Sequence, residues 1–126
     1  MRNIVEYFDI IESVVAHSGS EDAEVSFEQT SQTSGMVEGF VNFYDGSRLE
    51  FTEVVYLEGQ HPIKKWYRYQ YIREGNAVFR YDNAPHYPDL PDFPHHKHTA
   101  EGEVVSATEP TLGRILREIV DLFTAD

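Results

Sequence analysis

The stretch Lys65–Asp82, KWYRYQYIREGNAVFRYD, decides the fold of this chain. Tyrosines alternate with other residues over Lys65–Ile72, and this period of two predicts a β-strand with one tyrosine-rich face. Glu74-Gly75-Asn76 then predicts a turn, and Ala77–Asp82 predicts the next strand. Two strands joined by so short a turn predict an antiparallel hairpin.

Similar strand patterns precede this hairpin. Apolar and polar residues alternate over Ala23–Glu28, apolar residues share one face over Val37–Phe43, and alternation returns over Leu49–Val55. Asp45-Gly46 predicts a tight turn between the last two of these segments. The sequence therefore predicts about five strands within residues 22–82, joined in chain order as a meander.

Helices are predicted at both ends of the chain. Asn3 and Glu6 have the spacing of a capping box, and an apolar stripe follows, so a helix is expected over about residues 3–17. A second stripe predicts a helix over about residues 109–124, with Pro110 in its first turn. The predicted fold is a single α+β domain over residues 1–126, a curved antiparallel sheet packed on N- and C-terminal helices.

Composition excludes several classes of protein. The chain has 126 residues and no cysteine, which excludes a disulfide framework, a thiolate nucleophile and a cysteine-based metal site. No apolar run approaches the roughly 20 residues that a membrane span needs, and the first residues lack the pattern of a signal peptide. We therefore expect a cytoplasmic protein without membrane contact.

The charge is distributed unevenly along the chain. Ten basic and 22 acidic residues give a formal charge of −12, which by itself argues against nucleic-acid binding. Residues 61–98, however, contain six basic and four acidic residues, a balance of +2, and five of the six histidines; the rest carries −14. Because charges on a surface are largely screened beyond about 8 Å, an acidic body does not forbid contact with RNA at a basic strip.

The segment 83–100 breaks the strand pattern. Pro85, Pro88, Pro91 and Pro94 recur every three residues, which excludes an α-helix or an inner strand there and predicts a long loop. Loops longer than about 12–15 residues often carry function. Four histidines lie in or next to this loop, and their side chains support three interpretations.

One interpretation is a divalent metal site. His96 and His98 would project alike from an extended segment, and neutral imidazole is a good ligand for zinc or nickel. Lys97 between them would oppose a cation. The remaining ligands would come from a third imidazole and a carboxylate, with His95, Asp82, Asp89 and Asp92 as the candidates.

A second interpretation is cleavage of RNA through its 2′-hydroxyl group, without a metal or another cofactor. This reaction needs a general base and a general acid that titrate near neutral pH, as histidine does, and cations against the phosphate. Tyrosines of the same sheet would stack on unpaired bases. The candidate catalytic residues are His86, His95, His96 and His98 as acid and base, Arg68, Arg80 and Lys97 on the phosphate, and Asp82 to orient a histidine or an arginine.

The third interpretation is a protein-binding or metal-binding module without catalysis. Histidines and prolines of a long loop can cap backbone groups and stiffen the loop against a sheet. The row of Tyr67, Tyr69 and Tyr71 is more often a packed strand face than a platform for bases.

Two strings in this region also resemble a known family. Arg80–His86 (RYDNAPH) and Phe93–His98 (FPHHKH) are similar to the signature of the TumE-type toxins of prokaryotic toxin–antitoxin systems. The likeness extends more loosely to Lys65–Arg73 and Val41–Phe51, about half of the chain in all. It implies a small cytosolic toxin that a cognate antitoxin protein binds and silences. A helix followed by an antiparallel sheet is similar to compact toxin ribonucleases, although those are usually basic.

Overall fold

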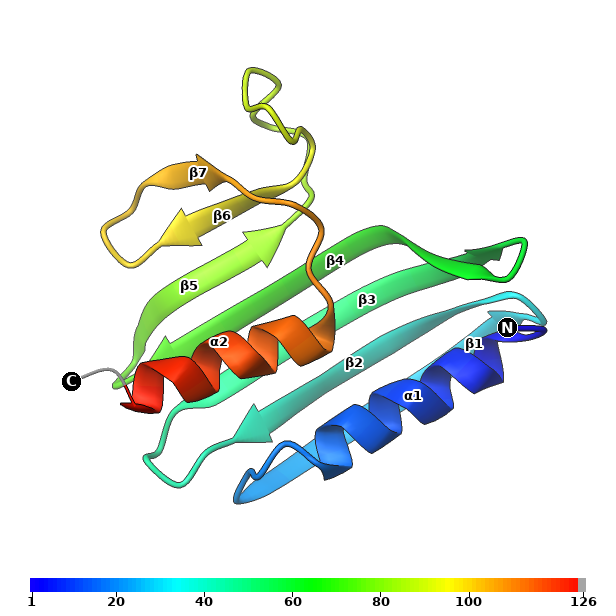
Figure 1. The fold of residues 1–126 in the computed structure, drawn as a ribbon, viewed down its shortest axis with the longest axis horizontal. Helices are drawn as coiled ribbons and strands as arrows, with labels where there is room; N and C mark the ends of the chain where they lie inside the picture. Colours follow the sequence, from blue (N-terminus) through cyan, green and yellow to red (C-terminus); the bar gives the residue numbers. More distant parts are fainter. Residues whose placement is uncertain (125–126) are drawn as a thin grey trace.

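The computed structural model describes residues 1–124 and consists of two helices and one seven-stranded antiparallel sheet (Figure 1). Each strand pairs with the next strand along the chain, so the sheet is a simple meander. The elements are α1 (Ile4–Ala16), β1 (Asp22–Ser31), β2 (Ser34–Asn42), β3 (Arg48–Glu58), β4 (His61–Arg73), β5 (Asn76–Asp82), β6 (His96–Thr99), β7 (Val104–Ser106) and α2 (Leu112–Thr124).

The predicted α+β domain with a meandering antiparallel sheet is confirmed, but the prediction of about five strands is wrong. The two extra strands, β6 and β7, lie at the end of the segment expected as a loop and just after it. The prolines that exclude strand structure end at Pro94, so the backbone N–H groups from His96 onward are free to pair with β5. Sequence alternation over four residues was too short a signal to predict them.

The start of the second helix also differs from the expected position near residue 109. Helix α2 begins at Leu112, because the Oγ1 atom of Thr111 accepts a hydrogen bond from the backbone N–H of Arg114 (3.2 Å). Such a contact is typical of an N-terminal cap. Pro110 therefore precedes the helix instead of occupying its first turn.

Both helices cover one face of the sheet, which holds the hydrophobic core (Figure 1). The tyrosine row of β4 lies in this core: Tyr67, Tyr69 and Tyr71 are all 0% exposed. The expectation that they stack on unpaired bases is therefore wrong, because no base can reach them. Their alternation in the sequence predicts that the three tyrosines share a face, but it does not indicate which face the helices cover.

A charged cluster stabilises the core beneath the helices. The fully buried carboxylate of Glu53 accepts hydrogen bonds from the hydroxyls of Tyr7 and Tyr69, and Nζ of Lys64 lies 3.6 Å from it. Burial raises the pKa of Tyr7 and lowers that of Lys64. Lys64 also donates to the carbonyl of Pro110 (2.5 Å), so the cluster joins α1, β3, β4 and the segment before α2.

The opposite face of the sheet, here called the open face, carries no helix in the described part of the chain (Figure 1). Alternation sends the other residues of β4 to this face, among them Trp66 and Arg68, which are exposed. Strands β5 and β6 extend the open face, to which β6 contributes His96 and His98 of the second string.

Candidate functional site

Alternation along the chain divides the predicted histidines between the two faces of the sheet. Nδ1 of His95 lies 2.8 Å from the hydroxyl of Tyr67, in the core. Lys97 forms an ion pair with Glu118 of α2 (2.9 Å). Both residues thus lie on the helix-covered face, whereas His96 and His98 lie on the open face with Asp82. The structure does not bring His95 and Lys97 to the other candidate residues.

The strand register places the open-face residues in two rows. Arg68, Asp82 and His96 are direct neighbours across β4, β5 and β6. In the next row, Arg80 lies opposite His98. Side chains directly opposite each other on neighbouring strands lie within contact distance, so the pairing of β6 with β5 assembles the site.

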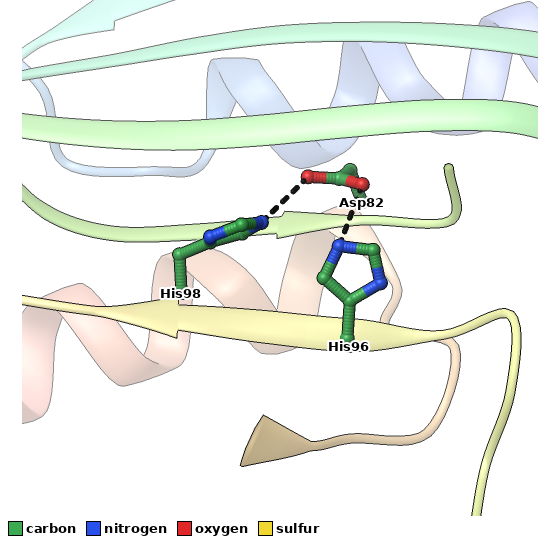
Figure 2. Close-up of side chains that lie close together, drawn as sticks. All are labelled: Asp82, His96 and His98. Atoms are coloured by element: carbon green, nitrogen blue, oxygen red, sulfur yellow. Dashed lines mark ion pairs between the residues drawn. The ribbon is translucent and has the colours of Figure 1, made fainter. Parts of the chain in front are cut away.

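Asp82 is the centre of this cluster (Figure 2). Its Oδ1 lies 2.9 Å from Nε2 of His96 and its Oδ2 lies 3.4 Å from Nε2 of His98. The backbone N–H of Ala84 donates to Oδ1 as well (3.0 Å). The Asp82 side chain is 8% exposed, so these contacts replace the water that the carboxylate loses on burial.

Arg80 connects Asp82 to His98. Its Nε donates to Oδ2 of Asp82 (3.0 Å), and its Nη2 lies 2.8 Å from Nε2 of His98. A guanidinium group only donates hydrogen bonds, so Nε2 of His98 is the acceptor and carries a lone pair. Burial, followed by the charge of Arg80, lowers the pKa of His98. His98 is therefore set up as a neutral base.

His96 is held on both sides of its ring. Nδ1 lies 3.0 Å from the carbonyl oxygen of Pro94, which can only accept, so Nδ1 donates. Nε2 faces Asp82, and the ring of Tyr87 packs edge-on with centroids 4.8 Å apart. The side chain is 1% exposed. His96 thus positions Asp82 and offers no accessible nitrogen to a substrate.

The cluster opens into a cavity of about 220 Å³ on the open face. His86, which is exposed, lies in its wall beside the turn that follows β5. Trp66 and Tyr87 also line the cavity, and sequence reasoning did not include them among the site residues. Alternation on β4 was the signal for Trp66, since it shares a face with Arg68. The complete lining is Trp66, Arg68, Arg80, Asp82, Ala84, His86, Tyr87, His96 and His98.

Three of the candidate metal ligands converge among the described residues. One ligand atom each of Asp82, His96 and His98 lies within 4.8 Å of the other two. Asp92 instead accepts a hydrogen bond from Ser106, the last residue of β7 (2.7 Å), and His95 lies on the other face. Asp89 is exposed in the proline segment and does not line the cavity.

Fold and site together define a small α+β protein with an arginine, aspartate and histidine cluster on the open face of a meandering sheet. The family model described as Toxin TumE matches residues 8–123, so the chain belongs to this toxin family. Neither the curated proteins nor the solved structures include a match to the chain. Over the described residues, the helices are too short and too polar to cross a membrane.

Proposed function

We propose that this toxin cleaves RNA by metal-independent acid–base catalysis, and that a cognate antitoxin protein binds and silences it. The observation that carries the proposal is the contact of 2.8 Å between Nη2 of Arg80 and Nε2 of His98. We infer that Arg80 binds the phosphate and that His98 is the base beside it, since both side chains line the same cavity. Family membership supports the role as a toxin.

In the first step, the phosphate of the RNA competes with the imidazole of His98 for the guanidinium of Arg80. A phosphate group binds a guanidinium more strongly than a neutral imidazole does, because the hydrogen bonds to it are charge-assisted. Arg80 would turn to the phosphate together with the exposed Arg68, and this movement frees Nε2 of His98. His98 then takes the proton of the 2′-hydroxyl, whose oxygen attacks the adjacent phosphorus.

The second group needed is an acid for the leaving oxygen. His86 is exposed in the wall of the same cavity and, as an imidazolium, would donate a proton to the 5′-oxygen as the P–O bond breaks. The products are a 2′,3′-cyclic phosphate and a 5′-hydroxyl end. The charge that develops on the phosphate oxygens is stabilised by Arg80 and Arg68.

Asp82 and His96 act behind these groups. A carboxylate repels phosphate, but Asp82 is buried and accepts a hydrogen bond from Nε of Arg80, which would keep this end of the guanidinium at the cluster while Nη2 turns to the phosphate. His96 in turn holds Asp82. Trp66 and Tyr87 offer ring surfaces at the cavity, and aromatic rings stack on unpaired bases of single-stranded RNA.

The test separates toxicity from cleavage. The wild type is expressed alone and with the neighbouring antitoxin gene, and purified protein is incubated with single-stranded RNA in EDTA. We expect growth arrest only without the antitoxin, and RNA ends with cyclic phosphate. His98→Gln and His86→Ala should each slow cleavage by about 100-fold or more. His61→Ala, an exposed histidine away from the cavity, is the matched control.

Two outcomes contradict the proposal at different levels. Unaffected growth with the wild type alone contradicts the toxic activity. Growth arrest with RNA that stays intact, or equal cleavage by His98→Gln and the wild type, removes the catalytic mechanism. Growth arrest with intact RNA would favour a toxin that acts by binding a partner without catalysis.

A further inference from the structure

We propose that Asp82, His96 and His98 also bind a divalent transition-metal ion of the zinc type, in competition with the guanidinium of Arg80, and that the bound ion inhibits the toxin. Metal binding is independent of the proposed ribonuclease activity, whereas the inhibition rests on it. The site would thus have two alternative cations, one supplied by the chain and one from solution.

The spacing of the ligand atoms fits such an ion. In a tetrahedral zinc site with bonds of roughly 2.0–2.1 Å, neighbouring ligand atoms lie about 3.3 Å apart. Nε2 of His96 lies 2.9 Å from Oδ1 of Asp82, and Nε2 of His98 lies 3.4 Å from Oδ2. One ligand atom from each of the three side chains lies within 4.8 Å of the other two. Two imidazoles and one carboxylate are a ligand set that zinc and its neighbours accept.

Hydrogen bonds with neighbouring backbone groups orient the ligand side chains, as is usual in metal sites. A histidine ligand generally donates its second ring N–H to a backbone carbonyl or a carboxylate, which fixes the tautomer. Nδ1 of His96 donates to the carbonyl of Pro94 (3.0 Å) in this way, which leaves Nε2, the ring nitrogen that faces Asp82, as the ligand atom for the ion. The backbone N–H of Ala84 orients the carboxylate (3.0 Å). The ligands come from two paired strands, β5 and β6, and are therefore rigidly placed.

Arg80 uses the same atoms that the ion needs. Its guanidinium binds Oδ2 of Asp82 and the lone pair of Nε2 of His98. Zinc and Arg80 therefore exclude each other from the cluster, both by position and by charge. The Arg80 side chain is 35% exposed and that of His98 is 23% exposed, so the guanidinium can turn outward and an ion can enter from solvent.

The expected inhibition follows from the atom that the ion occupies. A metal bound to Nε2 of His98 takes the lone pair that would accept the proton of the 2′-hydroxyl. Because His98 is the proposed base, cleavage stops while the ion is bound and resumes when a chelator removes it.

The experiment titrates Zn²⁺ into the full chain by calorimetry, after removal of any histidine tag. The wild type should bind one ion, and His61→Ala should bind it equally. His98→Gln and Asp82→Asn should bind at least 10-fold more weakly. Arg80→Gln should bind at least 10-fold more tightly than the wild type, because the competing cation is gone. This gain of affinity remains informative if a loss variant fails to fold.

The outcomes distinguish metal binding from catalysis. No saturable binding of one ion by the wild type, or binding by Arg80→Gln that is no tighter, overturns the proposal. Binding as expected, with RNA that is never cleaved, supports the metal site and contradicts the ribonuclease function. If RNA is cleaved, Zn²⁺ should inhibit and EDTA should restore the wild type; cleavage that persists or rises with bound Zn²⁺ contradicts the inhibition.

Discussion

The carboxylate of Asp82 lies 2.9 Å from Nε2 of His96, and both side chains are almost fully buried although they belong to the open face of the sheet. His98, two residues further along β6, is instead partly exposed and reaches the same carboxylate at 3.4 Å. Neighbouring histidines of one strand face thus differ in access to solvent. In the proposed site, the buried His96 therefore positions Asp82, and the partly exposed His98 is the base.

We predict that substitutions at the two histidines have different main effects. His96→Ala leaves Asp82 buried with one partner fewer and should cost about 2–4 kcal/mol in the free energy of unfolding, measured in urea. His98→Ala should change that free energy by less than about 1 kcal/mol, because the side chain is partly exposed. Cleavage per folded molecule should nevertheless fall more in His98→Ala. The reverse order of the two losses in cleavage would assign the base to His96.

Trp66 gives a prediction about substrate binding. The ring is 40% exposed and lines the cavity, and it lies on β4, which β5 separates from the histidines of β6. Stacking on a base contributes about 1–3 kcal/mol. Trp66→Ala should therefore raise KM for single-stranded RNA by about 10-fold or more with kcat little changed, and Trp66→Phe should restore most of the affinity. A fall in kcat at constant KM would contradict a stacking role.

Glu53 gives a prediction about stability that is independent of the site. Glu53→Ala removes the acceptor of two tyrosine hydroxyls and leaves the buried Lys64 without its counter-charge, so it should cost about 3–5 kcal/mol in the free energy of unfolding. A double variant with Lys64→Met removes the uncompensated charge and should recover part of this loss. Urea unfolding of the four proteins in this cycle measures the coupling. Additive losses would show that Lys64 and Glu53 do not interact.

Much of this architecture follows from the sequence, because clear alternation of apolar and polar residues over five or more positions predicts a strand. The hairpin of β4 and β5 and the core face of β3 are examples. The short strands β6 and β7 could not be predicted, since their pairing depends on the edge that β5 offers. The same limit applies to the site: composition identified the histidine-rich segment, but only the pairing of His96 with Asp82 shows which histidines face the cavity.

That pairing leads to a prediction about His95 and Lys97. Both are candidate site residues from the sequence, but the structure places them away from the open-face cluster. His95 contacts Tyr67 in the core, and Lys97 forms an ion pair with Glu118 of α2. His95→Gln and Lys97→Gln should each lower the melting temperature by a few degrees, since each loses a partly buried contact, worth about 1 kcal/mol. Cleavage of RNA per folded molecule should stay within about twofold of the wild type. A 100-fold loss in either variant, with the fold intact by circular dichroism, would move the reaction to the helix-covered face and contradict the open-face site.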